Sequence, residues 1–145
     1  SADKGTFVAT YGGAGLDASL LQIASLRLLP ADDPRLSATI DVVRRELERG
    51  GLLLRYREDD GFGVPTVAFI MCTFWLVEAL VVVGRTAEAR ELLKRTLSAS
   101  SPLGLLAEDY DVAGLRMWGN FPQAYSHVGL IHAAFAASPR WSDVI

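Results

Sequence analysis

Apolar residues recur along this chain at helical spacing, and the alternation typical of strands is hard to find. The first predicted helix covers residues 16–29 and ends at Pro30. Its apolar positions are Leu16, Leu20, Ile23 and Leu26. The second begins with Asp33 as N-cap and Pro34 in its first turn, and the pair Gly50–Gly51 ends it. Its apolar stripe comprises Leu36, Ile40, Val43 and Leu47.

The third predicted helix, residues 66–83, is apolar almost all round and is closed by Gly84. It is about long enough to span a bilayer. However, Glu78 lies well inside it and no basic flank marks an orientation. A buried core helix is therefore favoured over a membrane span, with Glu78 paired within the structure.

Two more helices are predicted in the second half of the chain. The fourth covers residues 86–98, with four inward positions: Ala89, Leu92, Leu93 and Leu97. The fifth starts near Asn120 or Phe121, tolerates Pro122 in its first turn, and runs to about Ala137. One of its faces carries Phe121, Tyr125, Val128 and Phe135.

The connections between these helices alternate in length. Short turns join the first helix to the second and the third to the fourth, whereas residues 51–65 and 100–119 form long loops. This alternation suits stacked helical hairpins with their long loops at one end. Long loops in a compact domain are usually functional. The sequence thus predicts a single all-α domain over residues 1–145, with its functional site at the end that carries the long loops.

Composition narrows the classes of function. Half of the residues are hydrophobic, and the net charge of -3 gives no footprint for nucleic acid or an anionic membrane. Five helices are an odd number for hairpins, so a partner helix is missing and we expect the isolated chain to self-associate. Cys72 lies in an apolar run and is predicted to be a buried, reduced thiol. No secretory leader opens the chain, and we expect a cytoplasmic protein.

Candidate chemistry concentrates in the stretch GLLAEDYD, residues 104–111, which places Glu108, Asp109 and Asp111 around one tyrosine. Taken alone, these acids fit a solvated loop as well as a catalytic site. His127 and His132 make a poor metal site and are predicted to pack instead. We expect neither a metal nor a cofactor.

Five segments, in order, resemble the C-terminal part of glycoside hydrolase family 15, which includes glucoamylases, glucodextranases and bacterial trehalases. They are LDASLL, LRYREDDG, FIMCTFWLVEAL, GLLAEDYD and GNFPQAYSHVGLI. The resemblance covers residues 7–137, approximately. It implies the C-terminal portion of a six-fold α/α barrel with its active site at the loop end. The remaining N-terminal part of the barrel would complete it.

The resemblance also implies roles for single residues. The family hydrolyses α-glucosides with inversion, using a glutamate as general acid and another as general base. Glu108 matches the base, and no residue of this chain matches the acid. Arg55 matches an arginine that binds sugar hydroxyls, and Tyr56 and Gln123 are further substrate-binding candidates. Tyr125 stands where many relatives carry a tryptophan at the sugar site, but it fits the core equally well.

Four neighbouring residues are given structural roles. Asp109 is expected to be solvated and Asp111 to cap a turn. Asn120 is expected to be an N-cap, and Trp118 to pack.

One segment departs from the family. GFGVPTVAFIMCTFW lacks both the acid usual in trehalase-like relatives and the Asn-Pro-Trp of glucoamylases, so both specificities stay open. The predicted function is an inverting α-glucoside hydrolase acting on an α-glucoside or oligosaccharide. The alternative is a non-catalytic helical-hairpin module for binding or interaction.

Overall fold

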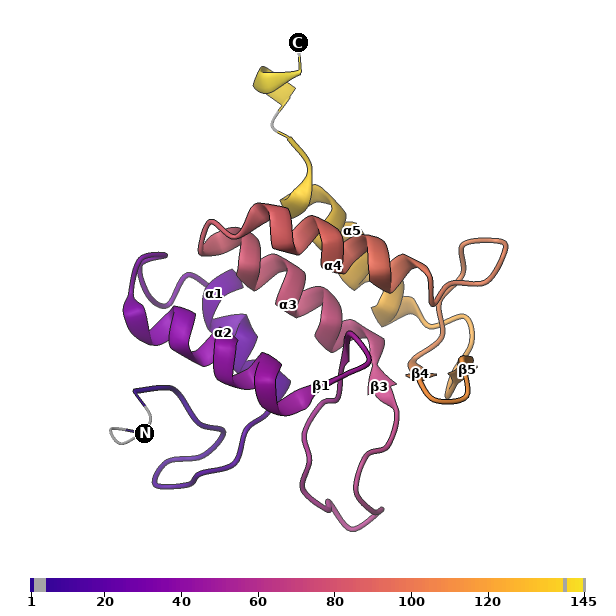
Figure 1. Ribbon diagram of the computed structural model, residues 1–145, viewed down its shortest axis with the longest axis horizontal. Coiled ribbons are helices and arrows are strands. Elements are labelled where there is room, and N and C mark those ends of the chain that lie inside the picture. Colours follow the sequence, from indigo (N-terminus) through magenta and orange to yellow (C-terminus); the bar gives the residue numbers. More distant parts are fainter. Residues whose placement is uncertain (2–4, 140, 145) are drawn as a thin grey trace.

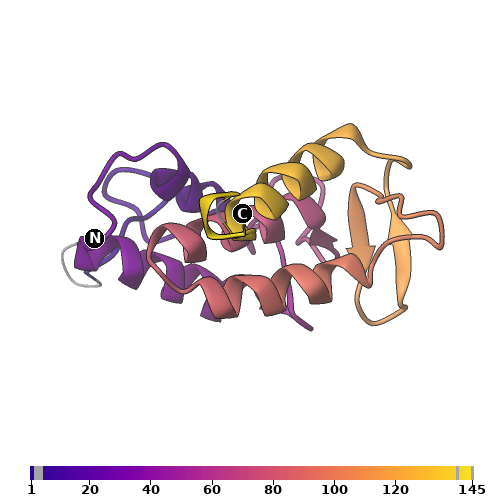
Figure 2. The same cartoon turned by 90° about the horizontal axis from the view of Figure 1, so that it is seen from above.

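Five α-helices pack around one apolar core in the computed structural model, which describes residues 1, 5–139 and 141–144 (Figure 1). The helices are α1 (Gln22–Ser25), α2 (Pro34–Leu47), α3 (Ile70–Val82), α4 (Thr86–Leu97) and α5 (Ala124–Ala137). Two 3-10 helices accompany them, η1 (Ala18–Leu21) and η2 (Trp141–Asp143). α3 runs through the middle, with α1 and α2 on one side and α4 and α5 on the other (Figures 1 and 2).

The helix predicted at residues 16–29 is shorter than expected. It consists of η1 and the single turn α1, and Asp17 caps it by accepting a hydrogen bond from the Ser19 N–H at 2.7 Å. Arg27 adopts φ 53°, in the left-handed region, which turns the chain out of the helix. Leu26, one of the apolar positions of the predicted helix, is consequently exposed.

The second helix is confirmed, including its cap. Asp33 accepts a hydrogen bond from the Arg35 N–H at 2.9 Å, and the predicted stripe is buried. The pair Gly50–Gly51 does not close the helix, which ends at Leu47. It forms instead the two-residue turn between strands β1 (Glu48–Arg49) and β2 (Leu52–Leu53).

The all-α expectation needs correction at the loop end. Strands β3 (Ala68–Phe69), β4 (Asp109–Asp111) and β5 (Arg116–Trp118) form an antiparallel sheet in that order, beside the start of α3. Its strands are two or three residues long, which is too short for alternation to be visible in the sequence. Because residues 68–69 pair with β4, α3 begins at Ile70 and not near residue 66.

α3 forms the centre of the core. Phe74, Leu76, Val77 and Leu80 are fully buried, and so is Cys72, as predicted. Within the described part of the chain, no helix combines the length and the apolarity needed to cross a membrane.

α5 packs on α3 by one face only. At Gly129 a Cβ atom would come 2.7 Å from Met71 Sδ, so the two helices approach closely there. The opposite face exposes four apolar side chains: Tyr125, Val128, Ile131 and Phe135. On α4, Leu97 is also exposed, contrary to its predicted inward position.

The start of α5 also differs from the prediction. The Gln123 N–H donates a hydrogen bond to Leu106 O at 2.9 Å, which fixes the preceding segment against residues 105–107. The helix therefore starts at Ala124, and Pro122 lies before its first turn.

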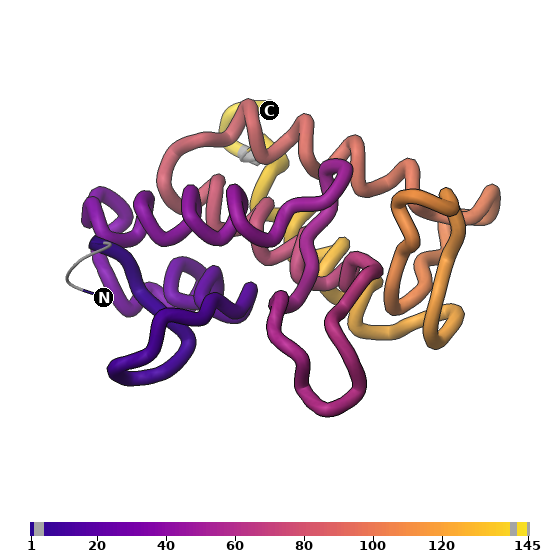
Figure 3. The backbone as a smooth tube through the Cα atoms, turned by 60° about the horizontal axis from the view of Figure 1, so that its bottom comes forward, coloured from indigo at the N-terminus to yellow at the C-terminus, as the bar shows by residue number. Residues whose placement is uncertain are grey.

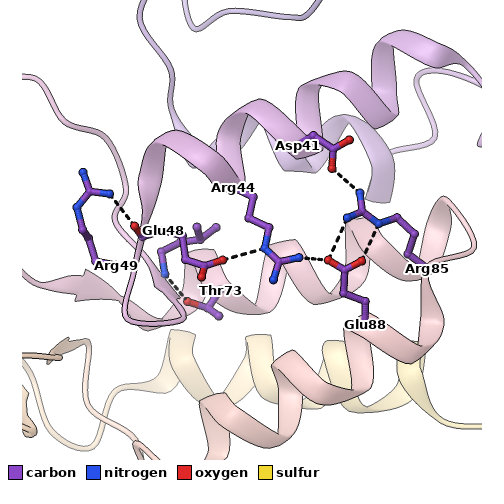
Figure 4. A network of polar contacts seen from close by, with 8 residues as sticks. Asp41, Arg44, Glu48, Arg49, Thr73, Arg85 and Glu88 are labelled. Carbon is purple, nitrogen blue, oxygen red and sulfur yellow. Dashed lines mark hydrogen bonds and ion pairs between the residues drawn. The ribbon is translucent and has the colours of Figure 1, made fainter.

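A polar network joins α2 to the start of α4 (Figure 4). Arg44 of α2 pairs with Glu88 of α4 and, at 2.8 Å, with Glu48. Arg85 pairs with Glu88 at 2.8 Å and with Asp41 of α2 at 2.5 Å. The pairs Arg44–Glu88 and Arg85–Asp41 link α2 to the start of α4.

Candidate active site

The two long loops meet at the start of α3, as their lengths predicted. A cavity of about 260 Å³ lies between them. It is lined by Arg55, Tyr56, Pro65, Val67, Phe69, Glu108 and Asp109. The loop of residues 54–67, which carries the arginine, projects beyond the helices on this side (Figure 3). Glu108, which is remote in the sequence from Arg55 and Tyr56, thus lines the same cavity as they do.

Glu108 is held through both its backbone and its side chain. Its carbonyl accepts a hydrogen bond from the Ile70 N–H at 3.1 Å, and its N–H donates to Asn120 O at 2.9 Å. Asn120 also donates to Glu108 Oε2, from Nδ2 at 2.8 Å and from its backbone N at 3.2 Å. Asn120 is thus not the predicted N-cap but orients the carboxylate. No described residue donates to Oε1, which leaves that oxygen available.

The residues before Glu108 are anchored to α5. The Ser126 hydroxyl donates to Ala107 O at 2.7 Å. His127 Nε2 accepts from the Leu106 N–H at 3.4 Å, so the ring proton sits on Nδ1 and is donated to Gln123 O at 2.7 Å. His127 therefore has the structural role predicted for it, and the segment that carries Glu108 is fixed before any ligand binds.

Arg55 is oriented by Asp17 and Trp75. Its Nε lies 2.9 Å and 3.1 Å from the two carboxylate oxygens of Asp17, and its guanidinium carbon lies 5.7 Å from the Trp75 ring centroid. Its terminal Nη atoms have no hydrogen-bond partner among the residues that the structure describes. A guanidinium held in this way presents two donors to a pair of hydroxyls or to a carboxylate.

Asp17 was missed by the sequence reasoning. It belongs to the segment LDASLL, where its visible role is that of a helix cap. The Ala18 N–H donates to Arg55 O at 2.8 Å, which brings the two segments together. A pairing between residues so distant in the sequence leaves no local signal, so only the fold reveals it.

The two other acids of GLLAEDYD differ from each other. Asp111 accepts hydrogen bonds from the Ala113 and Gly114 N–H groups at 3.1 Å and 3.0 Å, as a turn-capping residue does. These bonds, with that from Arg116, lower its pKa. Asp109 is half-buried, whereas the sequence led us to expect a solvated side chain. Burial, followed by the charge of Glu108, raises the pKa of Asp109 to about 6.

Comparison with known proteins establishes the family of this chain. The sequence profile of the glycosyl hydrolases family 15 matches residues 2–135. The chain belongs to this family. It is 47% identical over 133 residues to a trehalase of Mycolicibacterium smegmatis, covering 90% of this chain and 20% of that protein. It is 41% identical over 133 residues to a trehalase of Thermoplasma volcanium, covering 91% of this chain and 21% of that protein.

Solved structures agree with the family. The structure "Glycosidase Wild Type" superposes with a TM-score of 0.78 at 25% identity, covering 92% of this chain and 38% of that one. A variant of a glycosidase solved in complex with glucose gives a TM-score of 0.76 at 25% identity, with the same coverage. The chain spans about a fifth of the length of the curated relatives it matches.

The remaining family-derived candidates lie in different places. Tyr56 lines the cavity, and its hydroxyl donates to Asp60 Oδ2 at 2.5 Å, which raises the pKa of Tyr56. Gln123 and Tyr125 do not line this cavity, and Tyr125 is 65% exposed. Tyr125 is therefore not a core residue in this structure. Trp118 was expected to pack but is 51% exposed. The guanidinium carbon of Arg116 lies 4.7 Å from the centroid of its ring.

Proposed function

We propose that this chain supplies the general base and part of the sugar-binding wall of an inverting α-glucoside hydrolase whose substrate is trehalose. The observation that carries the proposal is the shared cavity of Glu108 and Arg55 in a family 15 chain. Trehalose is preferred over other α-glucosides because the similar curated proteins are named trehalases. The five helices would form the C-terminal part of an α/α barrel that other segments complete.

In the proposed reaction, Glu108 takes a proton from a water molecule as the water oxygen attacks the anomeric carbon. The bond from that carbon to the glycosidic oxygen breaks, and this oxygen takes a proton from the general acid. Base and acid carboxyls of inverting enzymes lie about 6.5–9.5 Å apart, with the water between base and sugar. The hydrogen bonds from Asn120 to Oε2 leave Oε1 of Glu108 for the water. The acid would come from a part of the barrel outside this sequence.

Arg55 would bind hydroxyls of the sugar under attack. Asp17 occupies its Nε, so the terminal nitrogens are the donors that would bind the sugar. Preorganised donors of this kind cost little reorganisation when the substrate binds. Tyr56, on the same wall, would contact the same sugar.

The test uses the complete natural protein that contains this sequence. Glu108→Gln is expected to reduce trehalose turnover by about 10²–10⁴-fold, because the proton acceptor is lost. Glu91→Gln, on the exposed face of α4, is the matched control and should retain wild-type activity. A Glu108→Gln protein as active as wild type would refute the role of Glu108. Sugar binding without turnover by the wild-type protein would favour the non-catalytic module instead.

Product stereochemistry gives a second readout. Inversion at one anomeric carbon of trehalose releases one β-glucose and one α-glucose, which NMR distinguishes before mutarotation. Two α-glucose molecules per turnover would mean retention and would contradict the proposed mechanism. The 145-residue chain alone is expected to be inactive, because it lacks the proposed acid.

A further inference from the structure

Asp109 differs from the other acids of the two long loops. The others accept hydrogen bonds from side chains or from the backbone: Glu108, Asp111, Asp60, Asp59 and Glu58. The Asp109 carboxylate accepts none from the residues that the structure describes, although it is half-buried. Burying a carboxylate without a partner costs free energy. The fold thus keeps an acid here that its own stability does not require.

The Asp109 carboxylate lies beside that of the proposed base. A Cβ atom on Gly119 would stand 2.9 Å from Glu108 Oε2 and 3.1 Å from Asp109 Oδ2. The two carboxylates thus converge on a position where any side chain would collide with them, and Gly119, with φ 74°, leaves this space open. Both residues line the cavity that Arg55 also lines.

Aromatic side chains flank Asp109 on its sheet. In the β3–β4–β5 register, Phe69 and Trp118 stand directly opposite Asp109 on either side. Directly opposed residues of an antiparallel sheet project from the same face. Ligand sites typically combine aromatic surfaces with a few polar groups. A sugar ring matches this face, because its C–H surface can lie on an aromatic ring while its hydroxyls donate hydrogen bonds.

We propose that Asp109 is a substrate-binding residue whose carboxylate accepts a hydrogen bond from a sugar hydroxyl in the cavity beside Glu108. This inference rests on the proposed function. Asp109 does not suit the role of general acid, because its Oδ2 is nearer to Glu108 Oε2 than the about 6.5–9.5 Å that an inverting pair requires. The raised pKa of Asp109 agrees with a carboxylate that lacks the donor a bound sugar would supply.

The experiment measures kcat/KM of the complete natural protein on trehalose and on analogues that lack the same hydroxyl on both glucose units, because trehalose is symmetric and can bind in either orientation. Asp109→Ala is expected to lower kcat/KM on trehalose by about ten- to a hundredfold, the usual effect of a hydrogen bond to a charged group. For one analogue, which lacks the hydroxyl bound by Asp109, the variant and the wild type should have similar values. Asp111→Asn, in the same strand, is the matched control and should stay within about twofold of wild type.

The outcomes separate this inference from the proposed function. If Glu108→Gln is inactive while Asp109→Ala retains wild-type kcat/KM on trehalose, the inference is wrong and the proposed function stands. If Asp109→Ala impairs every one of these dideoxy analogues as much as trehalose, Asp109 contacts no hydroxyl and the inference is also wrong. If Glu108→Gln is fully active, the proposed function is wrong, and the inference that rests on it is wrong as well. The near-isosteric Asp109→Asn replaces Asp109→Ala should the latter not fold.

Discussion

α3 and α5 are both rich in apolar residues and contain few polar ones, yet their surroundings differ. α3 contacts η1, α1, α2, α4 and α5, and Phe74 at its centre is fully buried. α5 makes its main contacts with α3 and α4, and Phe135 on its outer face is 77% exposed. Both sequences indicate a largely apolar helix, but only α3 is covered on nearly all sides.

The comparison shows what uniform apolarity can predict. It predicts that a helix is covered on every side, but not which segment covers it. The exposed side chains of α5 form a stripe, comprising Tyr125, Val128, Ile131 and Phe135. In the proposed barrel, helices outside this sequence would cover this stripe, which we call the α5 stripe.

The largest expected effect comes from truncating one phenylalanine on each helix of the 145-residue chain. Phe74→Ala should reduce the free energy of unfolding by about 3–5 kcal/mol, since it leaves a cavity in a closed core. Phe135→Ala should change it by less than about 0.5 kcal/mol, because solvent already surrounds that ring. Urea denaturation of both variants, at a protein concentration low enough to keep the chain monomeric, measures the difference. Equal losses would show that the α5 stripe is buried within the monomer.

A smaller effect is expected where the two helices meet. Gly129→Val should destabilise the chain by about 1–3 kcal/mol, because the new side chain would overlap Met71 and Phe74. Ala124→Val, at an exposed position of the same helix, measures the effect of a valine that overlaps no neighbour, whereas at position 129 helix propensity itself favours valine over glycine. A similar loss of stability in the two variants would mean that α3 and α5 can move apart at Gly129 with little cost in free energy.

Much of the fold was predictable from the sequence, because helical periodicity is a local signal. The N-cap and stripe of α2 and the end of α3 follow from residues within a few positions of each other. The starts of α3 and α5 were misplaced because distant segments set them. Residues 68–69 pair with β4, and the Gln123 N–H bonds to Leu106 O.

The candidate site divides in the same way. The resemblance identified Glu108 and Arg55, and the fold brings them to one cavity. Of the residues that orient them, Asn120 was assigned as a helix cap and Asp17 was given no role, since their partners lie elsewhere in the chain. Asp109 was expected to be solvated, because the sequence does not show that Phe69 and Trp118 of the neighbouring strands lie opposite it.

The α5 stripe should also cause self-association of the 145-residue chain. Covering apolar surface is worth about 25 cal/mol per Å². We expect Ile131→Lys to weaken association by about tenfold or more, equivalent to about 1.4 kcal/mol. Sedimentation velocity measures this, with Glu91→Lys on α4 as the control. A wild-type chain that stays monomeric at high micromolar concentration, without binding a hydrophobic dye, would show that its helices need no further partner.

The smallest expected effect concerns Glu78, the acid of α3 that faces α5. The Ser25 hydroxyl donates to its Oε2 at 3.4 Å. Burial raises the pKa of Glu78 above its usual value of 4.5, although the charge of His132 on α5 and the Ser25 hydrogen bond oppose this shift. The folded state therefore holds the proton more tightly than the unfolded state, so stability falls as the pH rises from about 4.5 through the raised pKa.

Glu78→Gln replaces the carboxylate by a neutral side chain of the same shape. The variant should be more stable than wild type at pH 7, by less than about 1 kcal/mol, because solvent still reaches this side chain. At pH 4 the two proteins should unfold at nearly the same urea concentration, since Glu78 is then largely protonated in both states. A variant less stable than wild type at pH 7 would show that Ser25 and His132 together stabilise the charged form more than burial destabilises it. Glu78 would then be a polar link between α3 and its neighbours, and the covered helix would depend on more than apolar contacts.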